Sequence, residues 1–488
     1  MARRFLLFTV LMILSRWSPA GELKDKAYAY ERWYQRWHSP GYGGTAEAIF
    51  ADPELTRLKM LDGIGDSTIW TGTYLGAEAF RWAVEHSPQA LANAKKAYRA
   101  LHYHLIATGK RGLLARYVGP LKPPFWNGSE EDCLKNDRCY IIPCPEGAGY
   151  GPKDKCFWLG DVSRDQYTGY WFGSALAYDL IDDEELRSWI RKDIQVIIDQ
   201  LVKDDFVIID VDGKPTGAGK VMAAMKFDWL LISAHILKDP NLKKRYEKEV
   251  NLHWLWNIIA SDRRLNQYFE YYAFNLDHQT YYNLIRLEND PHRKRYFQKV
   301  FREKVWGYTR GTSNVFFDYI AMASLERTIP ELVAQSREIL EKFPPPPNRL
   351  VPVKLEALPV RESSIQLCKL NHNIVWLACG LGLAKEKYFG GKLMYFYPIA
   401  SQPQKFENRP KSDFIWQRSP YFLADTWSPK FDCKDMSIKH RNWICTDPKA
   451  GRDRIALEMK RGYKVYPGVD YLVAYWMGRY YGFIDPDW

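Results

Sequence analysis

The sequence predicts an all-α fold, an (α/α)6 toroid in which an inner ring of helices is wrapped by an outer ring, with two long loop insertions. Three observations predict it. The 488 residues are 46% hydrophobic and include 19 Trp, 32 Tyr and 23 Phe, which excludes a disordered chain. Most of these aromatic residues recur in helix-length runs. Charged, amphipathic helices separate the runs.

The aromatic runs share small residues and a polar or acidic residue near the start. A helix that is apolar on nearly all sides is a buried one, so we expect these runs to form the inner ring. They cover residues 66–80, 165–179, 225–237, 277–288, 314–326 and 469–482.

The helices between them carry apolar residues at i, i+3, i+4 spacing and charges on the other side. Residues 87–108, 183–202, 241–259, 291–304 and 330–343 follow the first five inner runs, and residues 24–38 remain to pair with the sixth. A helical solenoid is the alternative, but it would need polar capping repeats, and the final run is rich in aromatics.

Two insertions divide the pattern into a main toroid at residues 21–343 and a closing inner helix at 469–488. Residues 109–164 hold four cysteines, and residues 344–468 begin with four prolines and contain strand-like runs at 373–378 and 392–399. Loops of this length usually have a function or a structure of their own. The second insertion is therefore a lid over one mouth of the ring or a small β domain behind a linker.

Residues 1–20 have the pattern of a signal peptide: Arg3 and Arg4, an apolar run, then Ser18-Pro19-Ala20. The apolar run is too short to span a bilayer, although an uncleaved amphipathic anchor is an alternative. No later stretch reaches 18 uninterrupted apolar residues, so we expect no integral membrane span. We therefore expect a secreted or periplasmic protein.

The eight cysteines fit an oxidising compartment. Their local grouping predicts disulfides: Cys133, Cys139, Cys144 and Cys156 in one insertion, Cys433 and Cys445 in the other, and Cys368 with Cys379. Three pairings of the first four are possible. Zinc sites favour C-x-x-C pairs, which are absent, so we expect no metal.

The formal net charge of +11 falls to +8 once residues 1–20 are removed. A basic surface suits acidic polymers such as uronic-acid glycans, although a solvated surface explains it too. No basic run of the nucleic-acid type occurs, so we expect no nucleic-acid partner. Gly-rich phosphate loops, G-x-S-x-G and EF-hand patterns are also absent, and we expect no cofactor. Asp212-Gly213 predicts a hairpin turn.

Chemistry is expected where the inner helices begin, because unpaired N–H groups there support acidic and ligand-binding residues. Asp66 and Asp165 are the candidate catalytic pair, and Asp161 is a substitute for Asp165. Glycosidic cleavage needs one protonated and one ionised carboxyl group. Each aspartate taken singly could instead be a helix cap.

Asp277 and His278 begin the fourth inner run, and His278 is a further acid/base candidate, with a buried core histidine as the alternative. Aromatic platforms for sugar rings are expected from residues within two turns of the aspartates: Trp70, Tyr74, Tyr167, Tyr170 and Trp171.

Arginine grips carboxylates through two hydrogen bonds, so Arg116, Arg164 and Arg418 are candidate clamps for an acidic sugar. Structural ion pairs would explain them equally well. Trp416 and Arg418 belong to a segment of the second insertion, 411–421, that could close over a ligand or simply dock the insertion on the ring.

The sixfold alternation with Asp-bearing aromatic inner helices resembles the (α/α)6-toroid group of carbohydrate-active proteins. That group includes unsaturated glucuronyl hydrolases and related six-hairpin glycosidases, sugar 2-epimerases and the toroid domains of some polysaccharide lyases. Unsaturated glucuronyl hydrolases use two inner-helix aspartates, one as the acid/base, and the resemblance implies these roles for Asp66 and Asp165. Epimerases use paired histidines, and only His278 is placed to serve.

Two classes of function follow. The first is an exported carbohydrate-active enzyme, a glycoside hydrolase acting on acidic oligosaccharides by carboxylate catalysis, with a polysaccharide lyase as a variant. The second is a non-catalytic exported toroid that binds a glycan or a protein partner. Two acids about 5 to 9.5 Å apart across an open cleft would favour the hydrolase.

Overall fold

The structure is a computed structural model that describes residues 22–261, 272–309, 314–343, 345–349 and 461–488, with the backbone of two further strands. Residues 1–20, the 373–378 run, Trp416, Arg418 and Cys379, Cys433 and Cys445 lie outside the described residues. Among the helices it does describe, none is long and apolar enough to cross a membrane.

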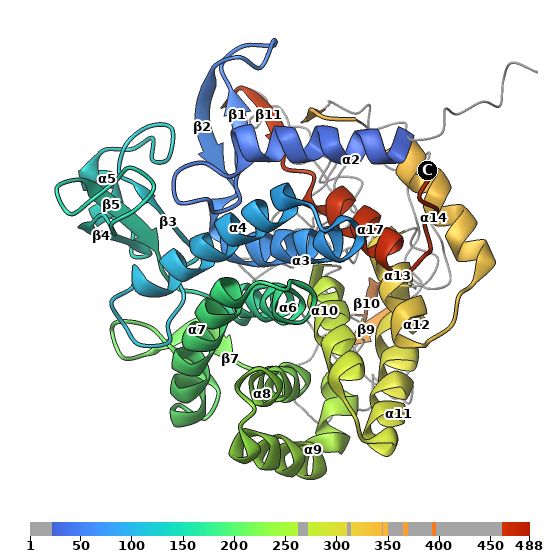
Figure 1. Cartoon of the computed structure of the whole chain (residues 1–488). Coiled ribbons are helices and arrows are strands. Elements are labelled where there is room, and N and C mark those ends of the chain that lie inside the picture. Colours follow the sequence, from blue (N-terminus) through green and yellow to red (C-terminus); the bar gives the residue numbers. More distant parts are fainter. Residues whose placement is uncertain are drawn as a thin grey trace, which may run out of the picture.

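Helices dominate the described part, and they alternate as the sequence predicts (Figure 1). The inner helices are α3 (Ser67–Glu85), α6 (Arg164–Leu180), α8 (Ala223–Leu237), α10 (Tyr272–Leu287), α13 (Val315–Ser324) and α17 (Val469–Tyr480). The outer helices are α2 (Glu22–Trp33), α4 (Pro88–Ile106), α7 (Glu184–Lys203), α9 (Pro240–Ser261), α11 (Pro291–Val300) and α14 (Pro330–Lys342).

Short elements join these helices. They are the helical turns η1 (Tyr34–His38), η2 (Ile64–Asp66), α5 (Glu130–Leu134), η4 (Phe301–Trp306) and α12 (Gly307–Thr309).

Capping side chains define where several helices begin. Asp183 caps α7 by accepting from the Leu186 N–H at 2.8 Å, and Asn314 caps α13 by accepting from the Phe317 N–H at 3.2 Å. Asp290 caps α11 in the same way, with Pro291 in its first turn. The fourth inner helix differs from expectation, because α10 begins at Tyr272 rather than at Asp277. Asp277 and His278 therefore lie more than one turn inside it.

Each inner helix contacts the next one along the chain, from α3 through α6, α8, α10 and α13 to α17, and α17 returns to α3. We call these six helices the inner ring. The outer helices lie outside it in Figure 1, and α2, left over at the N-terminus, contacts both α14 and α17. One continuous hydrophobic core includes side chains from all twelve helices.

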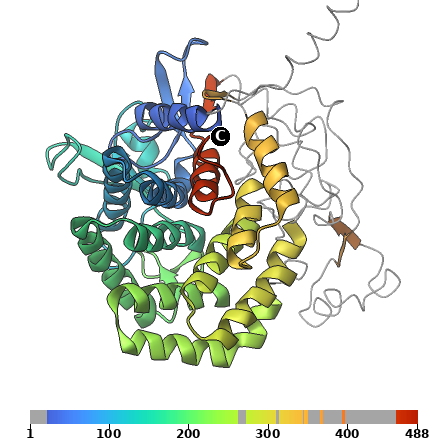
Figure 2. The ribbon, with the colours of Figure 1, turned by 45° about the vertical axis from the view of Figure 1, so that its right-hand side comes forward.

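The two ends of the described chain meet. Tyr471 of α17 donates to the Leu23 carbonyl of α2 at 2.9 Å. Strand β11 (Tyr463–Tyr466) pairs antiparallel with β1 (Glu47–Phe50), matching Val465 to Ala48, and the sheet order is β2-β1-β11-β8. Here β2 is Leu58–Asp62 and β8 is Asn348–Arg349. Figure 2 shows the C-terminal helix beside the N-terminal one.

The first insertion forms a three-stranded antiparallel sheet of β3 (Tyr117–Pro120), β5 (Lys155–Leu159) and β4 (Cys139–Pro143). Disulfides join Cys133 to Cys139 and Cys144 to Cys156, which is one of the three possible pairings. A hairpin of β6 (Val207–Ile209) and β7 (Pro215–Lys220) turns at the predicted Asp212-Gly213. In the second insertion, β9 (Ile365–Cys368) pairs with β10 (Leu393–Phe396), inside the predicted 392–399 run.

Candidate functional site at the N-terminal ends of the inner helices

Two contacts across the ring identify the helix faces that point to its axis. The Gln279 amide of α10 donates to the Thr73 hydroxyl of α3 at 3.0 Å. The ring of Phe172 on α6 meets Phe316 on α13 edge-on, with centroids 6.0 Å apart. Each contact joins helices three places apart in a ring of six. These four side chains therefore face the axis.

Aromatic side chains fill the axis toward the C-terminal ends of the inner helices. Tyr282 of α10 lies 6.0 Å from Phe172 and 6.4 Å from Phe80 of α3, measured between ring centroids. Its hydroxyl lies 2.7 Å from that of Tyr481, which follows α17. Tyr480 covers Phe80 at 5.3 Å. Among the described residues, packed aromatic side chains therefore close this end of the inner ring.

Polar side chains replace the aromatic ones toward the N-terminal ends. Gln279 also donates to Asn275, one turn earlier on α10, at 3.4 Å. Two helical turns are about seven residues, so a residue seven positions before an axis-facing one occupies nearly the same face. Asp165, in the first turn of α6, lies seven before Phe172 and therefore falls near the axis-facing side of that helix. Asp66 lies in η2, just before α3, with non-helical backbone angles, so helical spacing does not fix the direction of its side chain.

Two neighbouring side chains, Gln166 and Arg116, position the Asp66 carboxylate, which remains partly exposed to solvent. Gln166, in the first turn of α6, donates to Asp66 Oδ1 at 3.1 Å and accepts from the Ile69 N–H of α3 at 3.1 Å. The Arg116 guanidinium lies 3.6 Å from the same Oδ1, and the Asp66 side chain is 23% exposed. Gln166 thus links the starts of α3 and α6, and it was not foreseen from the sequence.

Arg116 and Arg164, the predicted carboxylate clamps, also bind the backbone. Arg116 donates to the carbonyls of Gly65 at 2.9 Å and Asp161 at 2.8 Å. Arg164, the first residue of α6, donates to the Lys220 carbonyl of β7 at 2.9 Å. Both guanidinium groups are partly buried at the N-terminal ends of α3 and α6. These contacts fix the loops that surround Asp66.

The starts of α3 and α6 are brought together by an unusually close backbone contact. A Cβ atom on Gly72 would lie 2.0 Å from the Gly169 carbonyl oxygen, and one on Gly173 would lie 2.0 Å from that of Gly72. Only glycine allows this approach. The glycines in the two aromatic runs therefore set the spacing of the helices that carry Asp66 and Asp165.

We expect Gly173→Ala to lower the free energy of unfolding by about 3 kcal/mol, because the added methyl group meets rigid backbone. Gly65→Ala, at the start of the same site, is the control, since a Cβ there meets nothing within 4 Å. Urea unfolding of both variants measures the difference. Equal stability of the two variants would contradict the close contact.

Asp161 is engaged in holding a loop. Its Oδ1 accepts from the Gly217 N–H at 2.7 Å, and its Oδ2 pairs with Arg138 at 2.8 Å. Its own N–H donates to Asp210 at 3.0 Å, and its backbone is left-handed at φ 51°. Both carboxylate oxygens thus already bind the β7 hairpin and the first insertion, so the contacts favour a structural role over the predicted catalytic one.

The structure does not place His278 at the mouth of the ring, where the sequence predicted an acid/base group. The ring is fully buried, stacked on Phe317 at 3.8 Å, with Nδ1 2.6 Å from the Phe274 carbonyl and Nε2 3.3 Å from the Thr309 hydroxyl. Burial lowers the pKa of His278 to about 3. Because α10 starts early and turns Gln279 to the axis, His278 faces α12 and α13 and is a core residue. Its neighbour Asp277 is also buried.

The predicted aromatic platforms are buried. The Tyr74 hydroxyl points to the outer helix α2, where it donates to Glu31 at 2.7 Å. The Tyr170 hydroxyl lies 3.1 Å from that of Tyr98 on the outer helix α4. Trp171 stacks against Trp229 of α8 at 6.1 Å. These three side chains pack helices together instead of lining the mouth, a correction to the sequence prediction; Trp70 is buried in α3.

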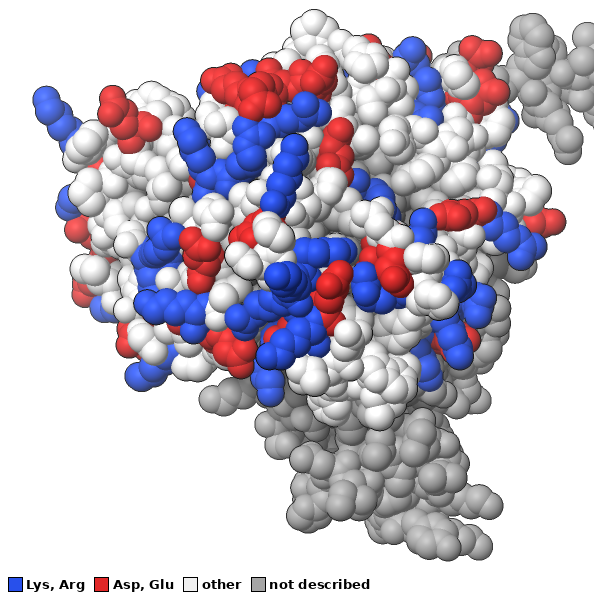
Figure 3. Space-filling view, turned by 60° about the horizontal axis from the view of Figure 1, so that its bottom comes forward, with Lys and Arg blue, Asp and Glu red and all other residues white. Residues whose placement is uncertain are grey.

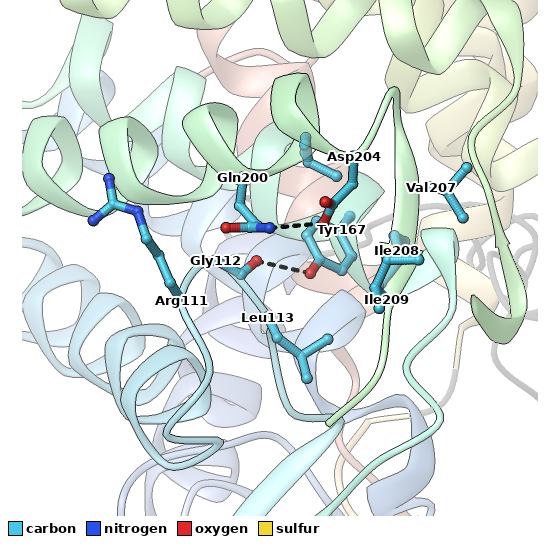
Figure 4. Close-up of a pocket in the computed structure, with 10 residues that line it drawn as sticks. Arg111, Gly112, Leu113, Tyr167, Gln200, Asp204, Val207, Ile208 and Ile209 are labelled. Carbon is cyan, nitrogen blue, oxygen red and sulfur yellow. Dashed lines mark hydrogen bonds between the residues drawn. The ribbon is translucent and has the colours of Figure 1, made fainter. Parts of the chain in front are cut away.

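Tyr167 faces away from the axis as well, into a small hollow between α7 and the β6 hairpin (Figure 4). Its hydroxyl donates to the Gly112 carbonyl at 3.0 Å and accepts from the Leu114 N–H at 3.2 Å. Gln200 of α7 and Asp204, the residue that follows α7, line the hollow from the other side. Tyr167 therefore anchors the start of the first insertion.

A buried carboxyl pair between α2 and α3 escaped the sequence analysis. Glu31 and Glu78 both bind the Tyr74 hydroxyl, each at 2.7 Å, and Asn93 of α4 lies 3.5 Å from Glu31 and 3.4 Å from Glu78. Arg81 is their nearby cation, 3.5 Å from Glu78. Burial raises the pKa of both carboxyl groups, and the charge of Glu31 raises that of Glu78 further.

A second buried acid lies on α8. Asp228 is fully buried, which raises its pKa well above the ordinary value, and the charge of Arg286 on α10 opposes that rise. Arg286 is itself paired with Asp179 at the end of α6. Glu78, away from the start of the 66–80 run, and Asp228, the one acidic residue of the 225–237 run, are carboxylates inside helices predicted to be buried, and that contrast is the signal that could have identified them. Among the described residues, no group of three or more His, Cys, Asp or Glu side chains could hold a metal ion.

Comparisons with known proteins add little. No protein-family model matches the chain, and no curated protein matches it. Among solved structures, the cellobiose 2-epimerase of Spirochaeta thermophila is similar at 15% identity, over 61% of this chain and 86% of that one, with a TM-score of 0.28. A likeness this loose carries no functional information, so the side chains of this chain have to be judged on their own contacts.

Proposed function

We propose that the chain is an exported enzyme that acts on acidic oligosaccharides, a glycoside hydrolase built on an (α/α)6 toroid with its active site at the polar mouth of the inner ring. The observation that supports it best is the setting of Asp66. This carboxylate is partly exposed, fixed by Gln166 and faced by Arg116 at the N-terminal end of α3, whereas the packed aromatic rings described above lie toward the C-terminal ends of the inner helices.

Asp66 and Asp165 divide the acid/base work. The oxygen of Asp66 that accepts from Gln166 and faces a guanidinium acts as an acceptor, as an ionised carboxylate does. Asp66 is thus suited to activate water or to attack the sugar carbon, and Asp165 to protonate the leaving oxygen. The close backbone contact of α3 with α6 keeps the two helices at a fixed separation.

An acidic substrate suits the charge of the chain and the arginines around the mouth. The formal charge is +11, and Arg116 and Arg164 lie at the N-terminal ends of α3 and α6. An uronic-acid end group would accept two hydrogen bonds from such a guanidinium. Export rests on the signal-peptide pattern of residues 1–20, and the two disulfides fit an oxidising compartment.

The test is a turnover screen of the mature chain, residues 21–488, on oligosaccharides with and without a 4,5-unsaturated uronic-acid end. We expect new reducing ends or loss of the unsaturated chromophore with at least one acidic substrate. Asp66→Asn and Asp165→Asn run beside the wild type. Binding without turnover of any substrate would contradict the enzyme assignment.

A non-catalytic toroid that binds a glycan or a protein partner is the second candidate. The burial of Tyr74, Tyr167, Tyr170 and Trp171 removes the expected sugar-binding platforms from the mouth, which weakens the case for any glycan ligand and, within this candidate, favours a protein partner. Calorimetry separates the two functions, because a non-catalytic toroid would turn over no oligosaccharide, and one that it did bind would bind equally well after Asp66→Asn. The lyase variant loses its histidine base, since His278 is fully buried.

A further inference from the structure

Helix α9 exposes an apolar patch at the edge of the molecule. Its members are Leu252, Leu255 and Trp256, which share one helix face at i, i+3, i+4 spacing and are 64%, 56% and 59% exposed. Trp254, 49% exposed, lies on another side of the helix, about 200° from Trp256. We call Leu252, Leu255 and Trp256 the α9 patch. Figures 1 and 2 both show α9 along the lower edge of the fold. Contiguous exposed apolar side chains usually mark an interaction surface.

Hydrogen bonds on the opposite side of α9 fix the outward orientation of the patch. Asn257 donates to the hydroxyls of Tyr281 at 3.0 Å and Tyr296 at 2.9 Å, and the Ser261 hydroxyl lies 2.8 Å from that of Tyr281. Tyr296 donates to the Trp254 carbonyl at 2.8 Å. This part of α9 therefore buries polar groups and exposes apolar ones, the reverse of an ordinary surface helix.

The surface around the patch is basic. Helix α9 and its neighbours α11 and η4 carry ten Lys and Arg against three Asp and Glu. Some of these cations pair with acids of other elements, namely Asp205, Glu288 and Glu326, so the basic excess of the surface is smaller than this count. Figure 3 views the molecule from the side where α9 lies and shows Lys and Arg gathered there, with fewer acidic groups between them. Lys244 and Lys248, on the first half of α9, are exposed.

We propose that the α9 patch binds the surface of an anionic lipid bilayer, with Trp256 at the headgroup level and the two leucines in the upper acyl region. Tryptophan favours the membrane interface, and lysine and arginine are attracted to anionic headgroups. Two copies of the chain placed patch to patch would bring two basic surfaces together, which opposes self-association. An acidic polysaccharide would satisfy the charges and leave the leucines in water.

The test is co-sedimentation of the mature chain with vesicles of phosphatidylcholine alone or mixed with phosphatidylglycerol. We expect binding to the anionic vesicles only, with a loss of about tenfold or more in the partition coefficient for Leu255→Ser combined with Trp256→Ser. Lys244→Glu combined with Lys248→Glu should weaken binding too, as should salt at about 0.5 M. This second variant changes only exposed charges, so it keeps the test valid if the Leu255→Ser, Trp256→Ser double variant folds poorly.

Leu134→Ser is the matched control, because Leu134 is 68% exposed on α5, in another element. It should bind vesicles like the wild type. Equal binding to neutral and anionic vesicles would overturn the proposal, as would full binding by the Leu255→Ser, Trp256→Ser double variant. A change in sedimentation coefficient on mutating the patch without lipid would show that a second copy covers it, and would also overturn the proposal.

Discussion

Asp66→Asn is expected to lower turnover about 100-fold or more, the usual contribution of a positioned acid or base. The substitution keeps the size of the side chain and an acceptor oxygen for the Gln166 amide, so the contact between α3 and α6 should survive. The thermal unfolding midpoint should therefore stay close to that of the wild type. Initial rates on the best substrate of the screen provide the measurement.

Asp182→Asn is the matched control for that loss of activity. Asp182 is 89% exposed in the α6–α7 connection, and its carboxylate pairs only with the half-exposed Arg187 among the described residues. Its turnover should equal that of the wild type. Full activity in both Asp66→Asn and Asp165→Asn would show that these two aspartates take no part in catalysis.

Glu78→Ala is expected to lower the free energy of unfolding by about 3 to 5 kcal/mol, the usual cost of removing one partner from a buried charged network. Glu78 is fully buried, and its loss leaves Arg81 with one fewer carboxylate and Tyr74 with one fewer acceptor. Glu78→Gln keeps the shape and an acceptor oxygen and should cost far less. Urea unfolding of the two variants measures the difference, and similar losses in both would contradict the network.

The buried pair of Glu31 and Glu78 also predicts that the stability of the fold depends on pH. The pKa of Glu31 and that of Glu78 are raised above the ordinary 4.5, so their contribution to stability is complete below that pH and is lost as the pH rises through the raised values. Glu78→Gln cannot lose a proton. We therefore expect the variant to gain stability relative to wild type as the pH rises above 4.5 and through the raised pKa values. A difference that stays constant over this range would contradict the raised pKa values.

The alternation of helices could be predicted because burial leaves a periodic trace in the sequence. The β1–β11 pairing could not, since Ala48 and Val465 are separated by most of the chain and each strand is only four residues long. Short strands carry little alternation, and their partners are set by the closure of the fold.

The site was only partly predictable for a related reason. The sequence of a helix that is apolar on all sides does not reveal which side faces the axis. A shift of one residue along the helix rotates the side chain by about 100° around the helix axis. Thr73 crosses the ring while Tyr74 points to α2. The aspartates could be proposed as site residues because they lie at helix starts, where position alone is informative. Gln166 and Glu31 carry no such signal and needed the packing to place them.

The most direct test of the account is a crystal structure of Asp66→Asn with a bound acidic oligosaccharide. The account predicts sugar at the N-terminal ends of the inner helices, with an oxygen within hydrogen-bonding distance of residues 66 and 165 and a carboxylate near Arg116 or Arg164. Sugar bound instead in the hollow beside Tyr167, or only on the outer helices, would contradict it.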